Sequence, residues 1–167
     1  MRTSIADFTG TVIQHDNPVD RAERNYICHA VLEGEPESRE QLWTELDAGE
    51  PRLRPPARAA RLACLPFFTY GLCRGDIIAV DGDDFVVGVL EKSGHRLLRA
   101  AFVRDHPLLE GTHADVHDEL VRLNMPHEWL QGTYVSADLS PGADPTEMIE
   151  LLQRLKEQGR LHWEIDA

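Results

Sequence analysis

The sequence predicts an α+β protein in which an antiparallel β-meander, a small curled sheet, is joined to a two-layer split β-α-β half of the ferredoxin-like type. Two observations support this prediction. The stretch from residue 63 to 103 holds the densest apolar sequence of the chain, divided by short turns that contain glycine. The last third of the chain alternates between patterns typical of strands and patterns typical of helices.

The meander is predicted from three runs with strand character, Asp76–Val80, Phe85–Leu90 and Arg96–Val103. Asp81-Gly82-Asp83 separates the first two runs, and Ser93-Gly94 separates the last two. These residues accept positive φ at little cost, which suits tight turns between antiparallel strands. We therefore expect the three runs to pair as consecutive neighbours.

The N-terminal part carries further strand signals. Ser4–His15 alternates enough to predict an edge strand, and Asn25–Leu32 is rich in residues that favour strands. Ala48–Pro56 contains three prolines, which lack the amide donor and restrict the residue before them, so we expect a connecting loop there.

The segment between these strands allows two interpretations. Ser38, followed three residues later by Gln41, resembles a helix capping box. Leu42, Trp43 and Leu46 would then form the buried side of a short helix. The same residues also fit a strand, and the sequence leaves both interpretations open.

The C-terminal part predicts helix, strand, helix and strand. Thr112 and Asp115 form a capping-box pair before a helical run that Pro126 stops, and Thr133–Leu139 alternates as a strand. The second helix is bounded by an N-cap at Asp144 and by Gly159, and its buried stripe is Met148, Ile149, Leu151, Leu152 and Leu155. A final strand is predicted from the alternation of Leu161, Trp163 and Ile165.

The length of 167 residues fits a single domain, 1–167, with a β-rich half at about 1–103 and an α/β sandwich half at about 96–167. The first residues lack the basic start and apolar run of a secretory signal. No stretch approaches the roughly 20 apolar residues that cross a bilayer. We therefore expect a cytoplasmic protein that does not bind membranes.

The net charge of −12 repels phosphate backbones and anionic membranes, so nucleic acid is an unfavourable partner and a basic protein a favourable one. The stretch Arg52–Arg61 is an exception, because it contains four arginines. It could form a basic stripe that binds nucleotides or nucleic acid. We favour the alternative that these arginines pair with the acidic stretch just before them.

The three cysteines, Cys28, Cys64 and Cys73, are an odd number without metal-binding spacing, which argues against disulfides and a thiolate zinc site. Cys28 and His29 are neighbours on a predicted strand and point to opposite faces, so they cannot form a catalytic pair with each other. A pair of Cys28 with His95 across the sheet stays open. We favour a buried structural thiol.

His113 and His117 are one helical turn apart, the spacing at which two imidazoles can share a metal ion. A third ligand would have to come from elsewhere, such as His106, His127 or Asp118. Because acidic residues flank both histidines, we favour a solvated helix face and predict no metal and no cofactor.

Three short motifs occur in a fixed order: Leu65–Gly71 (LPFFTYG), Gly75–Ile78 (GDII), and Ser93–His95 (SGH) with Arg99 four residues later. With Glu40–Trp43 and Gly159–Glu164, they resemble the bacterial family called domain of unknown function 4265, over roughly Tyr26 to Ile165. The chain departs from the pattern at Leu62-Ala63-Cys64, where a more polar residue is expected. The resemblance implies no reaction, cofactor or catalytic residue.

The motifs contain the candidate binding residues. His95 follows a glycine turn and could hydrogen-bond Asp76 on the neighbouring strand, with Arg99 on the same face of its own strand. These groups could form a polar pocket beside Phe68 and Tyr70 for an anionic or amide group. We favour the alternative that Asp76 and His95 only satisfy turn amides.

The aromatic turn is a further candidate. Phe67 and Phe68 are adjacent and cannot easily face one core together, so one of them could contribute a surface contact patch with Tyr70. Filling of the core is the alternative that we favour. The binding candidates are therefore Phe67, Phe68, Tyr70, Asp76, His95 and Arg99, and no residue is predicted to be catalytic.

Three classes of function fit these observations. The first is a non-enzymatic acidic binding protein, such as an inhibitor, immunity-type or regulatory partner of a basic protein. The second is a small enzyme or a tailoring protein that binds a small molecule in a polar pocket at the meander. The third is a nucleotide or nucleic-acid binder that uses Arg52–Arg61. We rank them in this order.

Overall fold

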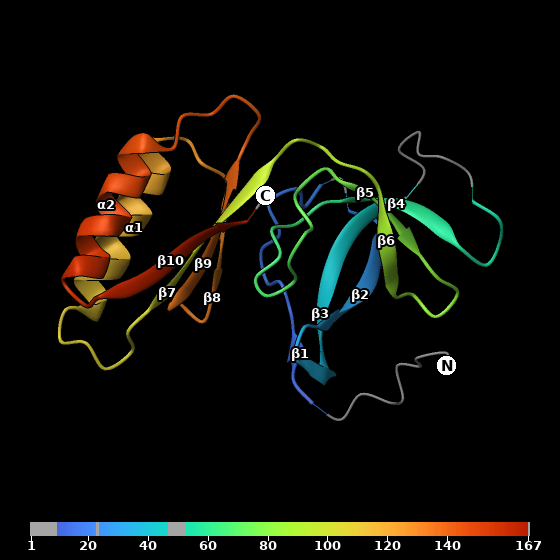
Figure 1. Cartoon of the computed structure of the whole chain (residues 1–167), viewed down its shortest axis with the longest axis horizontal. Helices are drawn as coiled ribbons and strands as arrows, with labels where there is room; N and C mark the ends of the chain where they lie inside the picture. Colours follow the sequence, from blue (N-terminus) through green and yellow to red (C-terminus); the bar gives the residue numbers. More distant parts are fainter. Residues whose placement is uncertain (1–9, 23, 47–52, 167) are drawn as a thin grey trace. The chain divides into compact units, whose positions relative to one another are not determined.

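A computed structural model describes residues 10–22, 24–46 and 53–166. The chain divides into two compact units, Met1–Gly94 and His95–Ala167, each with its own sheet (Figure 1). The predicted α+β class is confirmed, because a curled sheet in the first unit is followed by a second sheet with two helices. None of the helices in the described part of the chain is long and apolar enough to cross a membrane.

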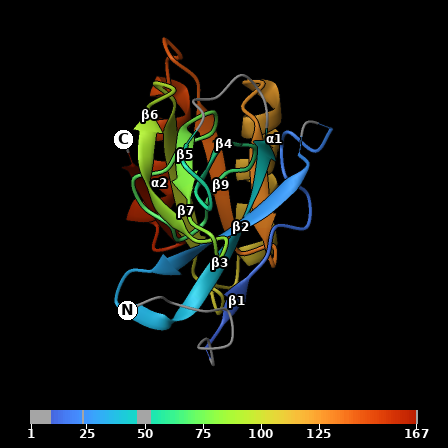
Figure 2. The same ribbon diagram turned by 90° about the vertical axis from the view of Figure 1, so that its right-hand side faces the viewer.

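The first unit contains strands that pair mostly in chain order. They are β1 (Val12–Ile13), β2 (Tyr26–Leu32), β3 (Glu35–Leu46), β4 (Arg58–Leu62), β5 (Ile77–Val80) and β6 (Val86–Glu91). From β2 to β6, each strand pairs antiparallel with the next, while β1 pairs parallel with β3 (Figure 2). A bridge between His29 and Phe85 brings the start of β6 back to β2, so the sheet curls.

β3 resolves the ambiguity of the segment that precedes the prolines. Leu42 and Thr44 are completely buried, whereas Gln41 and Trp43, which alternate with them, are partly exposed, as in a strand. The strand interpretation is therefore confirmed and the short helix is wrong. The physical reason is that β3 pairs on both edges, with β2 on one edge and with β1 and β4 on the other. A short helix would lose the backbone hydrogen bonds to these strands.

The apolar interior of the first unit lies inside the curled sheet. β2 to β5 contribute most of it, through small and branched apolar side chains. The buried cluster consists of Cys28, Ala30, Leu42, Ala60, Leu62, Cys64, Leu72, Ile78 and Val80.

One expectation for the meander needs correction. The hairpin of Asp76–Val80 with Phe85–Leu90 is confirmed as β5 and β6, but the third run is wrong as a neighbour of β6. Arg96–Phe102 forms β7, which pairs with β9 and β10 in the second sheet. The neighbour of β5 on its other edge is β4, whose two arginines hid its strand pattern in the sequence.

Other N-terminal predictions are met only in part. Of the edge strand predicted at Ser4–His15, Val12–Ile13 forms β1, and residues 4–9 lie outside the described residues. Of the predicted loop Ala48–Pro56, residues 48–52 also lie outside them. Residues 53–57 contain neither helix nor strand, as expected.

The second unit contains β7 (Arg96–Phe102), α1 (Leu109–Arg122), β8 (His127–Leu130), β9 (Tyr134–Leu139), α2 (Thr146–Glu157) and β10 (Leu161–Asp166). The strand order is β10-β7-β9-β8 and all pairs are antiparallel. This is the β-α-β-β-α-β arrangement, so the predicted ferredoxin-like half is confirmed. β8 was not predicted, and α1 begins at Leu109, before the predicted cap at Thr112.

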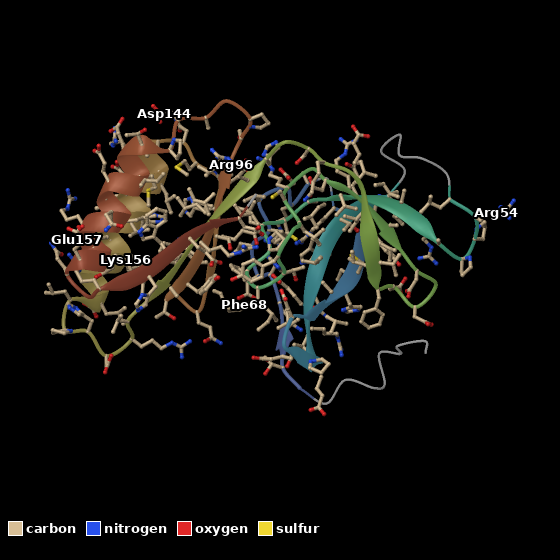
Figure 3. All side chains as sticks on the ribbon, viewed as in Figure 1. Arg54, Phe68, Arg96, Asp144, Lys156 and Glu157 are labelled. Carbon is tan, nitrogen blue, oxygen red and sulfur yellow. The ribbon has the colours of Figure 1, made fainter. Side chains whose placement is uncertain are left out.

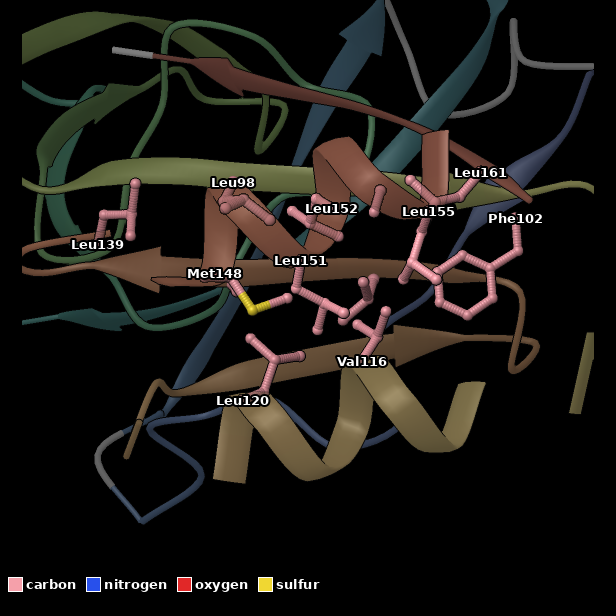
Figure 4. Packing of buried hydrophobic residues seen from close by; sticks show 13 residues of the cluster. Leu98, Phe102, Val116, Leu120, Leu139, Met148, Leu151, Leu152, Leu155 and Leu161 are labelled. Atoms are coloured by element: carbon pink, nitrogen blue, oxygen red, sulfur yellow. The ribbon is translucent and has the colours of Figure 1, made fainter. Parts of the chain in front are cut away.

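The two helices of the second unit pack an apolar stripe against its sheet. Figure 4 shows side chains of α1, α2 and the strands converging in one cluster. The predicted stripe of the last helix is confirmed for Met148, Leu151, Leu152 and Leu155, which are buried, whereas Ile149 is only partly buried. From the strands and α1, the cluster includes Leu98, Phe102, Val116, Leu120, Leu139 and Leu161.

Candidate functional site

The loop after β4 is organised around one buried carboxylate, Glu40 of β3. Its Oε1 lies 2.6 Å from the backbone N of Phe67 and 2.9 Å from Nε2 of His15. Its Oε2 accepts hydrogen bonds from the backbone N of Phe68 at 3.1 Å and from N and Oγ1 of Thr69 at 2.9 and 2.7 Å. One side chain therefore fixes three consecutive residues of the loop.

The surroundings of Glu40 favour its ionised form. Burial by itself would raise the pKa of this carboxyl group, but His15, the amide of Phe67 and the hydroxyl of Thr69 together hold the pKa below its usual value. The ring of His15 also stacks on Phe67, with 4.6 Å between the ring centroids. Glu40 thereby links the loop to the segment that follows β1.

A groove of about 290 Å³ lies beside this anchored loop. Its lining residues are Thr11, Ile13, Leu32, Glu33, Glu35, Phe68 and Tyr70. Tyr70 is 51% exposed, Phe68 (labelled in Figure 3) is partly buried by its neighbours, and both glutamates are exposed. The groove therefore combines apolar and aromatic surface with two carboxylates.

The structure separates the two adjacent phenylalanines of the motif. Phe67 is buried in the first unit, with 1% of its surface exposed, whereas Phe68 turns to the groove. Gly71 closes the loop with φ of 72°, a value that a residue with a side chain adopts at a cost. The aromatic turn thus contributes one ring to the interior and two rings to the groove wall.

The carboxylate of Asp76 connects two turns by hydrogen bonds. The carboxylate is completely buried, and Oδ2 accepts a hydrogen bond from the backbone N of Cys73 at 2.9 Å. Oδ1 accepts bonds from the backbone N and Oγ of Ser93 at 2.8 and 2.9 Å, and Lys92 Nζ lies 3.2 Å from Oδ2. Asp76 therefore satisfies turn amides, as in the alternative that we favoured from the sequence.

The other two members of the predicted polar pocket have partners of their own in the second unit. His95 Nδ1 lies 2.7 Å from Oδ1 of Asp138, and the possible hydrogen bond from His95 to Asp76 stays a hypothesis. Arg99 is completely buried and forms ion pairs with Asp166 at 3.1 Å and Glu164 at 3.8 Å. The reason is that both residues lie on or next to β7, which belongs to the second sheet.

Cys28, Cys64 and Cys73 are buried thiols that form no disulfide. Burial raises the pKa of Cys28 to about 12, which keeps the thiol protonated at neutral pH. A protonated thiol is a weak nucleophile, so Cys28 belongs to the interior of the curled sheet and not to a thiolate-imidazole pair.

His113 and His117 lie in an aromatic cluster with two residues of β8. His113 stacks on Trp129 with 4.1 Å between the ring centroids, and the ring of His127 lies 5.4 Å from that of His117. Burial, and then the charge of His117, lower the pKa of His113. Among the residues that the structure describes, no group of three or more His, Cys, Asp or Glu side chains could hold a metal ion.

The arginine-rich stretch is partly engaged by carboxylates. Arg58 forms an ion pair with Asp84 at 3.3 Å and donates to the hydroxyl of Tyr26 at 2.8 Å. Arg61 lies opposite Glu45 in the register of β3 and β4. Arg52 lies outside the described residues.

Sequence reasoning missed the glutamates and the histidine of this site. Glu40 could have been found from its position in the strand, because alternation places it on the same face as the buried Leu42 and Thr44. A carboxylate on a buried face needs several hydrogen-bond donors. His15, Glu33 and Glu35 carry no such signal, since strands distant in sequence bring them to the loop.

Comparisons with known proteins give a family and a fold. The chain is similar to a structure described as a hypothetical protein from Neisseria gonorrhoeae, with a TM-score of 0.63 and 16% identity over 83% of this chain and 91% of that chain. This likeness concerns the fold alone. No curated protein matches the chain.

The family match includes both Glu40 and the loop that it anchors. The model of the family described as domain of unknown function (DUF4265) matches residues 40–163. This range covers most of the 167 residues and, except for Glu164, all the motifs that resemble the family. The chain therefore belongs to the DUF4265 family.

Proposed function

We propose that the protein is a non-enzymatic binding protein of the cytoplasm that docks a basic protein partner, as an inhibitor, immunity-type or regulatory protein would. The observation that carries this proposal is the groove wall of Phe68 and Tyr70, which Glu40 anchors beside the exposed carboxylates of Glu33 and Glu35. The three cysteines are buried as thiols, which supports a reducing compartment.

The chemistry of the groove suits a basic partner. Tyrosine is enriched among the residues that contribute most to protein binding, because its ring offers a large contact area with few rotatable bonds. Carboxylates at the rim attract cations, and the net charge of −12 accelerates the encounter with a positively charged protein. Rigid aromatic residues next to acids are thus a reason to expect specificity as well as attraction.

The other polar groups considered as candidates are poorly suited to catalysis, which favours a binding function. Asp76 and Arg99 are committed to buried hydrogen bonds and ion pairs, and Cys28 is protonated. The groove volume of about 290 Å³ is at the lower limit of roughly 300 Å³ for small-molecule sites, which favours the insertion of a single side chain.

Affinity capture from a lysate of the host, followed by mass spectrometry and titration of the purified partner, tests this proposal. We expect a basic protein that binds more weakly at high salt. The double substitution Glu33→Gln and Glu35→Gln should weaken its binding about tenfold, because it removes both carboxylates from the groove rim.

The matched control is Glu110→Gln with Glu157→Gln, which changes two exposed glutamates of the second unit and gives the same net charge. It should leave the affinity within about twofold. Equal losses for both pairs of substitutions would mean that only the overall charge acts, and a captured partner that is acidic would refute the proposal.

A further inference from the structure

The groove beside Phe68 and Tyr70 offers three kinds of surface to one ligand. Ile13 and Leu32 are apolar, Phe68 and Tyr70 are aromatic, and the two carboxylates belong to Glu33 and Glu35. Leu32 is 9% exposed, whereas both carboxylates are exposed. A ligand that fits all three surfaces has an apolar stem, a flat or polarisable end, and a positive charge.

Among protein side chains, arginine meets these requirements better than lysine. The guanidinium group is planar, so it can stack on an aromatic ring and at the same time donate two parallel hydrogen bonds to a carboxylate. The ammonium group of lysine is a compact and strongly hydrated charge, and it loses more hydration on entering an aromatic wall. The apolar residues suit the methylene stem of either side chain.

The aromatic wall is also held in place before a ligand arrives. Glu40 binds the backbone of Phe68 and Thr69, and these bonds fix the loop between the two rings. A preformed wall reduces the entropy that a partner must lose on binding, which favours a defined side-chain pocket.

We infer that this groove is a pocket for a single arginine side chain, with Tyr70 as the residue that selects arginine over lysine. The inference rests on the proposed function, because the arginine is taken to belong to the basic partner. It adds the chemical identity of the ligand, which overall charge does not determine.

Three small probes test it without knowledge of the partner: the N-acetyl N-methylamides of arginine, lysine and citrulline. Citrulline has the shape of arginine without its charge. Each probe is titrated into the full chain and followed by NMR of the methyl and aromatic groups of the groove. We expect saturable shifts for arginine, binding of lysine weaker by about threefold or more, and no saturation for citrulline.

Two variants separate stacking from charge. Tyr70→Leu should weaken arginine binding about threefold and change lysine binding by less than about twofold, since only the aromatic face is lost. Glu33→Gln with Glu35→Gln should weaken both probes, and the control pair Glu110→Gln with Glu157→Gln should weaken neither. Because Tyr70 is half exposed, its substitution leaves the interior intact.

The possible results distinguish this inference from the proposed function. Equal binding of lysine and arginine, saturable binding of citrulline, or no binding of the arginine probe would each overturn the arginine pocket. In any of these cases, the proposal of a basic partner would stand if Glu33→Gln with Glu35→Gln weakened the binding of the captured protein. If the arginine probe binds as expected but the double substitution leaves the affinity for the captured partner unchanged, the arginine pocket stands and the proposed function fails.

Discussion

Glu40 is the residue on which the candidate site depends most. Its carboxylate accepts bonds from the backbone N of three loop residues and lies 2.9 Å from His15 while it is completely buried. A buried charge is tolerated only when donors surround it, and here all the donors except His15 come from the family motif. The motif and the glutamate thus form one structural unit.

Glu40→Gln should lower the free energy of unfolding by about 3 kcal/mol, because the amide group would direct its own donors at backbone N–H groups and would leave His15 without its anion. Urea unfolding followed by circular dichroism measures this change. Glu91→Gln, at an exposed position of β6 in the same sheet, is the control and should stay within about 0.5 kcal/mol. A loss no larger than that of the control would contradict the role assigned to Glu40.

The contribution of Glu40 should also depend on pH. Its pKa in the folded protein is lower than the ordinary value of 4.5, so its ionisation stabilises the fold above pH 4.5, and this stabilisation is lost as the pH falls through the folded pKa. The difference in unfolding free energy between the natural protein and Glu40→Gln should therefore be constant near neutral pH and shrink in acid. Urea unfolding measured from neutral pH down to acid tests this prediction. A difference that grows in acid would mean that the carboxyl group is protonated in the folded protein.

At the scale of elements, α2 shows how a helix gains its stability from one face. Its stripe is buried in the second unit, and Leu152 is completely inaccessible. Leu152→Ala should cost about 3 kcal/mol of unfolding free energy, because it leaves a cavity between the helix and the sheet. Val121→Ala on α1, where the side chain is 55% exposed, should change it by less than about 0.5 kcal/mol in the same thermal or urea measurement.

Elements also differ in how well local sequence defines them. The pattern from Asp144 to Gly159 predicted α2, although the N-cap is Pro145 and the predicted cap at Asp144 is wrong. β9 and β10 followed from alternation. β3 stayed ambiguous, since Ser38 and Gln41 imitate a helix cap, and β7 was given the wrong neighbour. Pairing partners are chosen by contacts distant in sequence, which local patterns do not contain.

At the scale of the whole molecule, each unit has its own sheet and its own apolar cluster. The single domain expected from the sequence stays a prediction, and it implies one cooperative unfolding transition. Scanning calorimetry of Leu42→Ala in the first cluster and Leu152→Ala in the second tests it. One transition that both substitutions shift is the expected result, whereas two transitions, each shifted by one substitution, would contradict it.

The sequence by itself determined the α+β class, the ferredoxin-like half, the family and the acidic charge. These features depend on local periodicity, caps, motifs and composition, each of which a short stretch or a simple count contains. It also indicated the aromatic turn, but not which of its rings faces outward.

Only the tertiary structure decided the groove and the partners of the buried charges. Glu40 meets the loop at residues 67–69 across more than 25 positions of the chain, and His95 lies beside Asp138 across more than 40. Such choices depend on which strands come together and on the need of every buried charge for a donor or an opposite charge. That need is satisfied in three dimensions, and so the site became visible only when the sheets were assembled.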